Sequence, residues 1–327
     1  MTVLVTGATG DLGGRLVARL LAEGHTVRIL TRRPFMAHRQ LGDQVAIHEW
    51  HPGVEPAPLE ALDGIETVIH LMGAPLGGRG GAETAARARE SRIKATARLR
   101  EGFGGRRWRL IVASVVEVSD DAGAILSDAN QESVTVLRQS GGPPKPFLAM
   151  AMRAAEREAE AARAAGASVA IVRLGLLLSP GGPLARLVAL AAAGFHPDLS
   201  RSLIPVIDPD DAAAMLAGLV SRPDIEGIIH GVAPEPLAGA DLSALLAKVA
   251  QLPIRLPAPR MLVQRRVGLL APLLYNRSRI VPQRLMDIGA GFQHPDPREC
   301  TAVAIAAILA ARPERMAWRT ARKVAST

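Results

Sequence analysis

Short apolar runs rich in β-branched residues alternate with amphipathic stretches along the first half of the chain. The apolar runs predict buried strands, because a strand covered on both faces needs no polar positions. These runs lie at residues 2–6, 26–30, 45–48, 67–71, 109–114 and 169–174. Helical spacing follows the first run, and it recurs over residues 82–101 and 147–165. The alternation indicates parallel strands with right-handed crossovers, as in a Rossmann-type doubly wound α/β sheet.

The pattern changes after Leu178, where Pro and Gly become frequent. Shorter helical pieces follow at 210–220, 241–249 and 301–311, and a short strand at 228–231 is expected to rejoin the sheet. We therefore expect a Rossmann domain over residues 1–178. A smaller C-terminal substrate lobe covers residues 179–311, with some elements returning to the sheet. Residues 312–327 form a basic tail.

Charge and hydropathy narrow the expected partners. The 327 residues include 39 Lys and Arg against 31 Asp and Glu, so the formal net charge is +8. These basic residues are dispersed among acids, and the densest patch, 106–109, is expected to be a solvated loop, so no nucleic-acid partner is expected. The apolar stretches 187–195 and 302–311 are shorter than the ~20 residues of a membrane helix. With no leader pattern at the N-terminus, we expect a cytoplasmic monomer or homodimer away from membranes.

The sequence predicts no metal site. A single cysteine, Cys300, excludes a disulfide framework and a zinc site built on a thiolate pair. Asp208, Asp210 and Asp211 are close in the sequence, but we expect Asp210 to cap the following helix and Asp208 to stabilise the turn.

The segment 7–13, Gly-Ala-Thr-Gly-Asp-Leu-Gly, lies between the first predicted strand and the first predicted helix. Glycines allow the backbone to turn tightly and to approach a pyrophosphate, while the N–H groups at the helix start face that anion. The position of the segment makes it a dinucleotide-binding loop. The expected contacts come from Gly7, Thr9, Gly10, Asp11 and Leu12.

The end of the second predicted strand indicates which dinucleotide binds. An NAD site usually places an acid there to accept from the ribose 2′-hydroxyl. This chain instead has Arg32 and Arg33, whose guanidinium groups suit a 2′-phosphate. The sequence therefore predicts NADP(H) as the cofactor.

These segments resemble the extended and atypical short-chain dehydrogenase/reductase superfamily, and within it the sugar-nucleotide epimerase-like family. The similar segments include 5–10, 31–34, 70–75, 91–93, 112–114, 146–149, 172–175 and 207–211. The resemblance implies that the turn of Leu71, Met72 and Gly73 passes under the cofactor, and that Trp50 lies near the adenine. It also implies that Ser114 lies beside the nicotinamide and that Arg92 is on a helix facing the active site.

One departure from the family pattern bears on mechanism. Ordinary members of the superfamily use a Tyr-x-x-x-Lys pair, but this chain has Phe147 and Ala151 at those positions, and its single tyrosine is Tyr275. Ser114 and Arg92 remain as candidate catalytic groups, since hydride addition creates an alkoxide that needs stabilising. A substrate that supplies its own proton is the other route.

Three functions follow from these features. The first is an NADPH-dependent reductase of a bulky, largely apolar ketone, such as an aromatic polyketide, bound by the apolar stretch 178–199. The second is a sugar-nucleotide epimerase or dehydratase, for which Arg186, Arg201, Arg260 and Arg277 supply cations. The third is a non-catalytic NADP(H)-binding sensor or partner protein.

Overall fold

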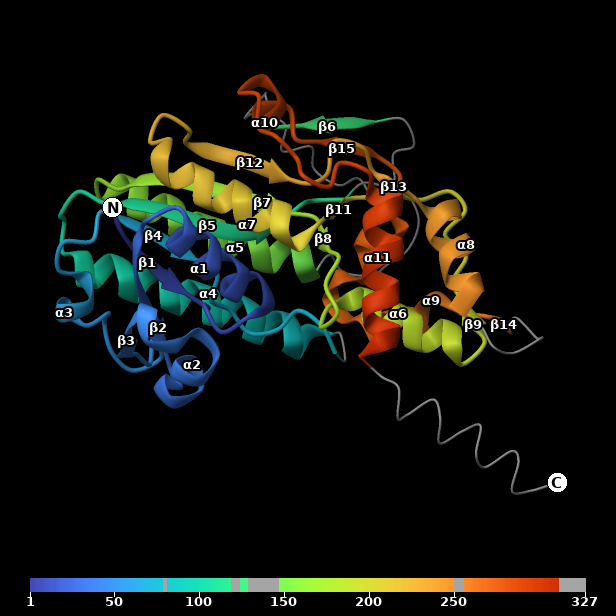
Figure 1. Ribbon diagram of the computed structural model, residues 1–327, viewed down its shortest axis with the longest axis horizontal. Coiled ribbons are helices and arrows are strands. Elements are labelled where there is room, and N and C mark those ends of the chain that lie inside the picture. The colour runs from blue at the N-terminus through green and yellow to red at the C-terminus, as the bar shows by residue number, and fades with distance from the viewer. Residues whose placement is uncertain (79–80, 119–123, 129–146, 250–255, 312–327) are drawn as a thin grey trace.

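The computed structural model of the chain describes residues 1–78, 81–118, 124–128, 147–249 and 256–311. A parallel sheet with helices on both faces forms one side of the molecule, and a mainly helical lobe forms the other (Figure 1). The predicted basic tail, 312–327, lies outside the described residues. Within those ranges no helix is long and apolar enough to span a membrane.

The central sheet has seven parallel strands in the order β12-β7-β5-β4-β1-β2-β3. The strands are β1 (Thr2–Thr6), β2 (Thr26–Thr31), β3 (Ala46–Glu49), β4 (Thr67–His70), β5 (Arg109–Val115), β7 (Ser168–Leu174) and β12 (Gly227–Gly231). This confirms the predicted doubly wound Rossmann-type sheet. The winding direction reverses between β1 and β4, and ligands of such sheets bind outside the carboxyl ends of the strands at that point.

Successive strand residues enter two different cores, because side chains alternate across a sheet. Val3 and Val5 pack with helices α1 (Asp11–Ala22) and α7 (Pro209–Gly218) on one face. Leu4 packs with α4 (Ala82–Phe103) and α5 (Phe147–Ala164) on the other. The sheet is therefore covered on both faces, as its continuous apolar strands predict.

Smaller elements complete the Rossmann half and the lobe. Beside the sheet lie α2 (Pro34–Leu41), η1 (Gly42–Gln44), α3 (Leu59–Leu62) and η2 (Leu219–Ser221). The helices of the lobe and of its connections are α6 (Pro183–Ala192), α8 (Gly239–Val249), α9 (Arg260–Val267), η3 (Gly268–Tyr275), α10 (Gln283–Asp287) and α11 (Pro297–Ala310). Short strand pairs are β6 (Ile125–Ser127) with β15 (Arg279–Val281), β8 (Leu176–Leu177) with β11 (Val206–Ile207), β9 (Phe195–His196) with β14 (Leu256–Pro257), and β10 (Leu203–Ile204) with β13 (Leu237–Ala238). Elements α7 and β12 return to the Rossmann half from beyond residue 178.

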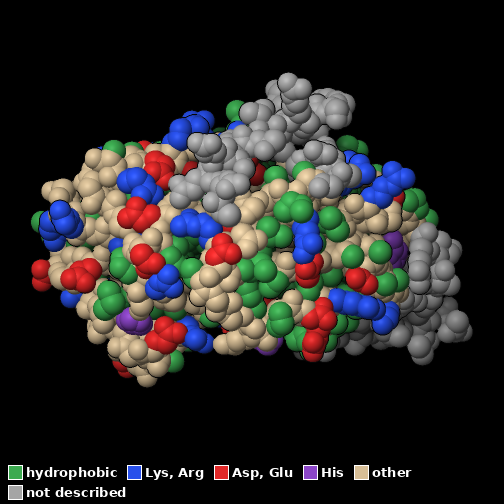
Figure 2. Space-filling model, turned by 90° about the horizontal axis from the view of Figure 1, so that it is seen from above, with side chains coloured by type: hydrophobic (Ala, Val, Ile, Leu, Met, Phe, Trp, Pro, Cys, Tyr) green, Lys and Arg blue, Asp and Glu red, His purple; other side chains and the backbone are tan. Residues whose placement is uncertain are grey.

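The basic patch at 106–109 is the solvated loop that the sequence predicts only at Arg106 and Arg107, which are exposed. Trp108 is buried and stacks on Phe103, with 4.1 Å between ring centroids. The Arg109 guanidinium is also buried and donates to the carbonyls of Arg222 and Ile225 at 2.9 and 2.8 Å. The patch therefore anchors the edge of the sheet. Elsewhere, basic and acidic side chains are interspersed on the face in Figure 2.

The N-terminal cap of α7 also differs from the prediction. Asp208, not Asp210, is the N-cap residue, and its Oδ1 accepts from the backbone N–H of Asp210 at 2.8 Å. Asp210 instead accepts from Arg15 Nη1 at 2.6 Å, which links α7 to α1. The helix starts with Pro209 at its first position, so the cap lies two residues earlier than the prediction had placed it.

Truncation of Leu99 tests how much the packing of α4 against the sheet contributes to stability. Its side chain is fully buried there, whereas Leu59 is 71% exposed. We expect Leu99→Ala to lower the free energy of unfolding by about 2–5 kcal/mol, because it leaves a cavity. The same truncation at Leu59 should change it by less than about 0.5 kcal/mol. Urea denaturation of the two variants measures both values, and equal losses would contradict the packing described.

Candidate functional site

The glycine loop after β1 packs directly on the turn after β4. Gly7 has a φ of +76°, and a Cβ there would lie 2.9 Å from the carbonyl carbon of Leu71. A Cβ on Gly13 would lie 2.2 Å from the Gly7 oxygen. Both positions therefore require glycine, which draws the start of α1 close to the carboxyl edge of the sheet.

The start of α1 fits a pyrophosphate. Its cap position is Gly10, and no side chain bonds to the N–H groups of the first turn. Unsatisfied N–H groups and the helix dipole attract an anion at this position. Thr9 and Asp11 are exposed beside the loop and Leu12 is half-buried. Their contacts with a cofactor stay predictions.

At the end of β2, Arg32 and Arg33 are exposed. Within the described part of the chain, neither guanidinium pairs with an acid, so both are free to meet a phosphate. Trp50 is fully buried, and its indole N–H donates to the carbonyl of Glu55 at 3.2 Å. The Trp50 ring therefore packs the core and does not offer a stacking face to adenine, although its expected nearness to the base stays a prediction.

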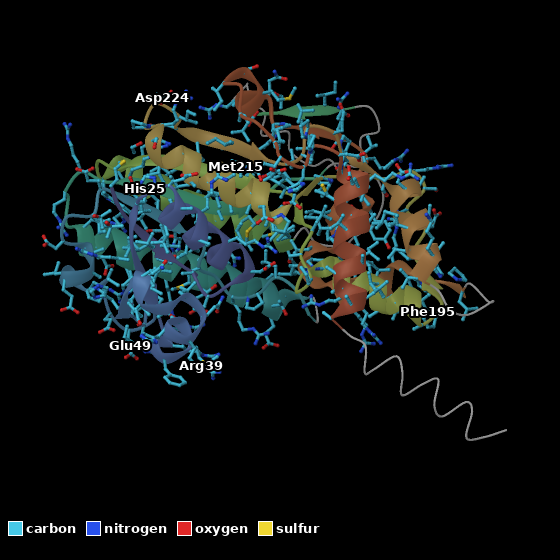
Figure 3. The ribbon with its side chains drawn as sticks, viewed as in Figure 1. His25, Arg39, Glu49, Phe195, Met215 and Asp224 are labelled. Atoms are coloured by element: carbon cyan, nitrogen blue, oxygen red, sulfur yellow. The ribbon has the colours of Figure 1, made fainter. Side chains whose placement is uncertain are left out.

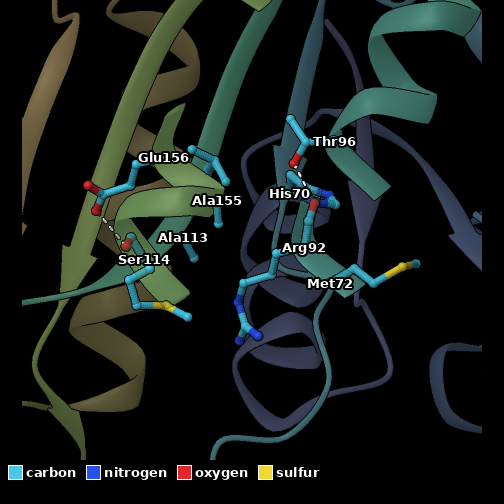
Figure 4. A pocket seen from close by; sticks show the side chains of 10 residues that line it. His70, Met72, Arg92, Thr96, Ala113, Ser114, Ala155 and Glu156 are labelled. Atoms are coloured by element: carbon cyan, nitrogen blue, oxygen red, sulfur yellow. Dashed lines mark hydrogen bonds between the residues drawn. The ribbon is translucent and has the colours of Figure 1, made fainter. Parts of the chain in front are cut away.

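A pocket lies at the carboxyl ends of β4 and β5, one strand away from the glycine loop (Figure 4). Two walls face each other across it in the close-up view. Their main residues are His70, Arg92 and Thr96 from β4 and α4, and Ser114, Ala155 and Glu156 from β5 and α5. The structure thus brings together the two predicted catalytic residues, Ser114 and Arg92.

Arg92 points inward from α4. Its Nη1 donates to the carbonyls of Ala74 and Ala88, both at 3.1 Å, and the guanidinium lies against Gly73. A Cβ on Gly73 would be 2.5 Å from the Arg92 Cζ, so the glycine of the predicted turn makes room for the arginine. Burial lowers the pKa of Arg92 to about 10, and the group stays positive at neutral pH.

Burial keeps the imidazole of His70 in its neutral form. Its Nδ1 shares a hydrogen bond of 2.6 Å with Thr6 Oγ1, and the Met72 N–H donates to the same oxygen at 3.4 Å. Burial, and then the charge of Arg92, lower the pKa of His70 to about 3. The other ring nitrogen, Nε2, has no hydrogen-bond partner among the described residues.

Ser114 bonds to an acid that the sequence analysis missed. Its Oγ donates to Glu156 Oε1 at 2.6 Å. Arg173 on β7 donates to the same carboxylate twice, from Nε at 2.9 Å and from Nη2 at 2.7 Å. Glu156 and Arg173 are 8% and 6% exposed, so this is a buried charge pair at the wall of the pocket.

Two further charged residues, Glu117 and Arg153, extend the pair of Glu156 and Arg173 away from the pocket. Arg173 Nη2 is 3.8 Å from Glu117, which accepts two hydrogen bonds from Arg153 at 2.6 and 2.8 Å. Burial opposes the charge of Arg173. The hydrogen bonds that Arg173 donates to Glu156, together with the negative charges of Glu156 and Glu117, outweigh this effect and raise the pKa of Arg173. Burial likewise opposes the charge of Glu117, yet Arg153 and Arg173 lower its pKa. Glu117 and Arg173 are therefore held in their charged forms.

The position of Glu156 in its helix is a signal by which the sequence could have identified it. It lies in the stripe of α5 that faces the core, where the other buried positions are Leu148, Ala151, Met152, Ala155, Ala159 and Ala162. A charged residue in such a stripe needs a partner. The positions of the family's Tyr and Lys carry Phe147, which is half-buried, and Ala151, which is buried.

The apolar stretch of the lobe does not line this pocket. Leu184, Leu187, Val188 and Leu190 are at most 3% exposed and pack the core of the lobe. Phe195 lies at the far end of the lobe from the helices of the sheet (Figure 3). The prediction that these side chains border a bulky substrate is therefore wrong for the site described.

One group of possible metal ligands occurs on the surface. Oxygen and nitrogen atoms of Asp208, Asp210 and His294 lie within 4.8 Å of one another. Asp208 already caps α7, and Asp210 pairs with Arg15. The expectation of no metal stays a prediction.

Comparisons with known proteins agree with the fold. The model of the NAD dependent epimerase/dehydratase family matches residues 3–206. The chain is 28% identical over 307 residues to the epimerase family protein SDR39U1 homolog, chloroplastic, of Arabidopsis thaliana, covering 90% of this chain and 84% of that protein. The structure of human epimerase family protein SDR39U1 with NADPH has a TM-score of 0.65 and 19% identity, covering 94% of this chain and 99% of that one. MoeE5 with UDP-glucose and NAD gives 0.68 and 22%, covering 94% and 98%. The resemblance stated from the sequence is confirmed.

The neutral His70 gives the fold a pH dependence. Between about pH 3 and pH 6.5 the unfolded chain binds a proton at His70 that the folded chain does not. The neutral His70 side chain therefore contributes fully to the free energy of unfolding above pH 6.5, and this contribution is lost as the pH falls toward 3. We expect His70→Asn to flatten this part of the curve of unfolding free energy against pH, measured by urea denaturation. The exposed His51→Asn should leave the slope unchanged, and an unchanged slope in His70→Asn would contradict the assignment.

Proposed function

We propose that this chain, which belongs to the NAD-dependent epimerase/dehydratase family, is an NADP(H)-dependent oxidoreductase that reduces a ketone. The observation that carries the proposal is the pocket in which a half-buried cation, Arg92, lies across from Ser114 without the usual tyrosine. NADPH, when bound, would supply the hydride, which no side chain can do.

The cofactor part of the proposal rests on the glycine loop and on the end of β2. The loop and the open start of α1 would hold the pyrophosphate, and Arg32 and Arg33 would hold the 2′-phosphate. A human neighbour in fold is described with NADPH, whereas MoeE5 is described with NAD. Arg32 and Arg33, which pair with no acid among the described residues, favour the phosphorylated form.

The pocket suits the charge that ketone reduction creates. The substrate oxygen gains negative charge as the hydride arrives, and a preorganised positive group in a buried site stabilises that charge strongly. Arg92 supplies the positive field, and Ser114 supplies a hydroxyl at the opposite wall. We propose a ketone without further restriction, because the apolar residues that suggested an aromatic polyketide belong to the core of the lobe.

Epimerase or dehydratase chemistry is the second candidate. MoeE5, a neighbour in fold, is described with UDP-glucose. Among the expected cations, Arg260 lies over the ring of Tyr275, with its Cζ 4.5 Å from the ring centroid. Arg186 donates to the carbonyl of Val267 at 3.3 Å. These groups would need to turn toward a nucleotide, so we place reductase chemistry first.

The cofactor preference can be tested at Arg32 and Arg33. Each charge-assisted hydrogen bond to a phosphate contributes about 1.5–3 kcal/mol. We therefore expect the double variant Arg32→Ala/Arg33→Ala, which removes two such groups, to weaken NADPH binding by about 100-fold or more and to leave NADH binding within about twofold. Nicotinamide fluorescence measures both. Arg39→Ala, on the outer side of α2 in Figure 3, is the matched control. Equal losses for NADPH and NADH would contradict a 2′-phosphate site.

The reaction can be tested with acetophenone and phenanthrenequinone, following the absorbance of NADPH or NADH, and with UDP-glucose, following its conversion by chromatography, because epimerisation and dehydration consume no cofactor overall. We expect NADPH oxidation with a ketone, and a loss of about 100-fold in Ser114→Ala and in Arg92→Ala, since each removes a group that acts on the reacting oxygen. Lys94→Ala, on the exposed side of α4, is the control.

Near-wild-type rates in both variants would instead favour a substrate that supplies its own proton. Turnover of UDP-glucose alone would favour the epimerase family's chemistry. Tight NADPH binding without any turnover would favour a non-catalytic binding protein.

A further inference from the structure

We propose that Glu156 exchanges a proton with the substrate oxygen through Ser114. The two residues would then replace the missing Tyr and Lys. This inference rests on the proposed reductase function and adds the path by which the substrate oxygen gains or loses its proton. Glu156 is a positioning residue in this scheme, because it acts on the substrate oxygen only through the Ser114 hydroxyl.

The hydrogen bond between the two side chains sets their roles. Ser114 Oγ is 2.6 Å from Glu156 Oε1, and a carboxylate can only accept, so the serine proton points at Glu156. The lone pairs of Oγ are then left for a substrate hydroxyl. Both residues border the pocket and lie on the wall that faces Arg92 (Figure 4). The geometry therefore makes Ser114 an acceptor for an alcohol while Glu156 is charged.

The carboxylate of Glu156 is fixed in place. Two parallel bonds from Arg173, at 2.9 and 2.7 Å, hold both of its oxygens. Bidentate pairs of this kind restrict orientation as well as adding energy. Since the residue is only 8% exposed, water does not compete for the bond to Ser114.

Arg173 has a second acid nearby, which allows Glu156 to become neutral. If Arg173 had only one partner, protonation of Glu156 would leave a buried charge uncompensated, at a cost of several kcal/mol. Glu117 lies 3.8 Å from Arg173 and is itself held by Arg153. The positive charge therefore keeps a partner in both protonation states of Glu156. A purely structural ion pair needs neither the second acid nor the bond to Ser114.

The proton step is balanced in both directions. When an alcohol is oxidised, its O–H proton passes to Ser114 Oγ, the serine proton passes to Glu156 Oε1, and the carboxylate becomes a carboxylic acid. The hydride that the same carbon loses would go to the nicotinamide cofactor of the proposed function, when it is bound. In ketone reduction the carboxylic acid returns its proton to Ser114, and Ser114 gives its own to the alkoxide. Serine is unchanged overall.

The main test compares Glu156→Gln with Glu160→Gln, a matched change at the exposed face of α5. Glutamine can still accept from Ser114 but cannot take up its proton. With NADPH and phenanthrenequinone, we expect Glu156→Gln to lower kcat about 100-fold. Its KM and its NADPH affinity, measured by nicotinamide fluorescence, should stay within about twofold.

The pH profile separates a proton role from a structural one. In the wild type, kcat for reduction should fall as the pH rises and Glu156 loses its proton, and kcat for alcohol oxidation should rise. Glu156→Gln should flatten both limbs, Glu156→Asp should restore part of them, and Glu160→Gln should keep them. A Glu156→Gln variant that folds, turns over and retains the wild-type pH limbs would overturn the proposal.

Infrared titration of the protein tests the coupling between Ser114 and Glu156 without any turnover. The carbonyl stretch of a protonated Glu156 should appear as the pH is lowered, disappear in Glu156→Gln, persist in Glu160→Gln and shift in Ser114→Ala. If this band does not respond to Ser114→Ala, the proposal fails even when ketones are reduced. If the band behaves as expected but no ketone is reduced, the proton coupling stands and the reductase function fails.

Discussion

The close approach between the glycine loop and the turn after β4 is the constraint on which the site depends. The backbone of Gly7, in a left-handed conformation, lies against the backbone of Leu71, where any Cβ would overlap it. This contact joins the carboxyl ends of β1 and β4 at the point where the sheet reverses its winding. It aims the open start of α1 across the same edge on which the pocket lies. The glycine loop and the candidate pocket are thus parts of one edge.

Buried charge is the second organising feature. Arg92 brings a positive group to one wall of the pocket, and Glu156 brings a negative group to the other. Desolvating such groups is expensive, and a buried ion pair is weak evidence for stability alone. Each charge here has fixed partners: backbone carbonyls for Arg92, and Arg173 with Ser114 for Glu156. Their position at the pocket gives the charges a chemical reason to be buried.

Local sequence patterns predicted the features whose partners lie nearby in the chain. The strands followed from apolar runs, the loop from its glycines, and the family from segments that the family model matches independently. The apolar side chains of 184–190 were misjudged because a sequence shows that a residue is apolar but not whether it faces a ligand or a core. Asp208 took the capping role that was expected of Asp210, because an N-cap depends on the residue at which the helix begins.

The sequence by itself determined the Rossmann-type sheet, the dinucleotide loop and the absence of the Tyr-Lys pair. Each is encoded within a short segment, where periodicity or the lack of a side chain is decisive. Only the tertiary structure decided that Glu156 meets Ser114, 42 residues away, and Arg173, 17 residues away. The physical reason is that a hydrogen bond depends on atoms a few ångströms apart in space. Three elements, β5, α5 and β7, must pack before those atoms meet.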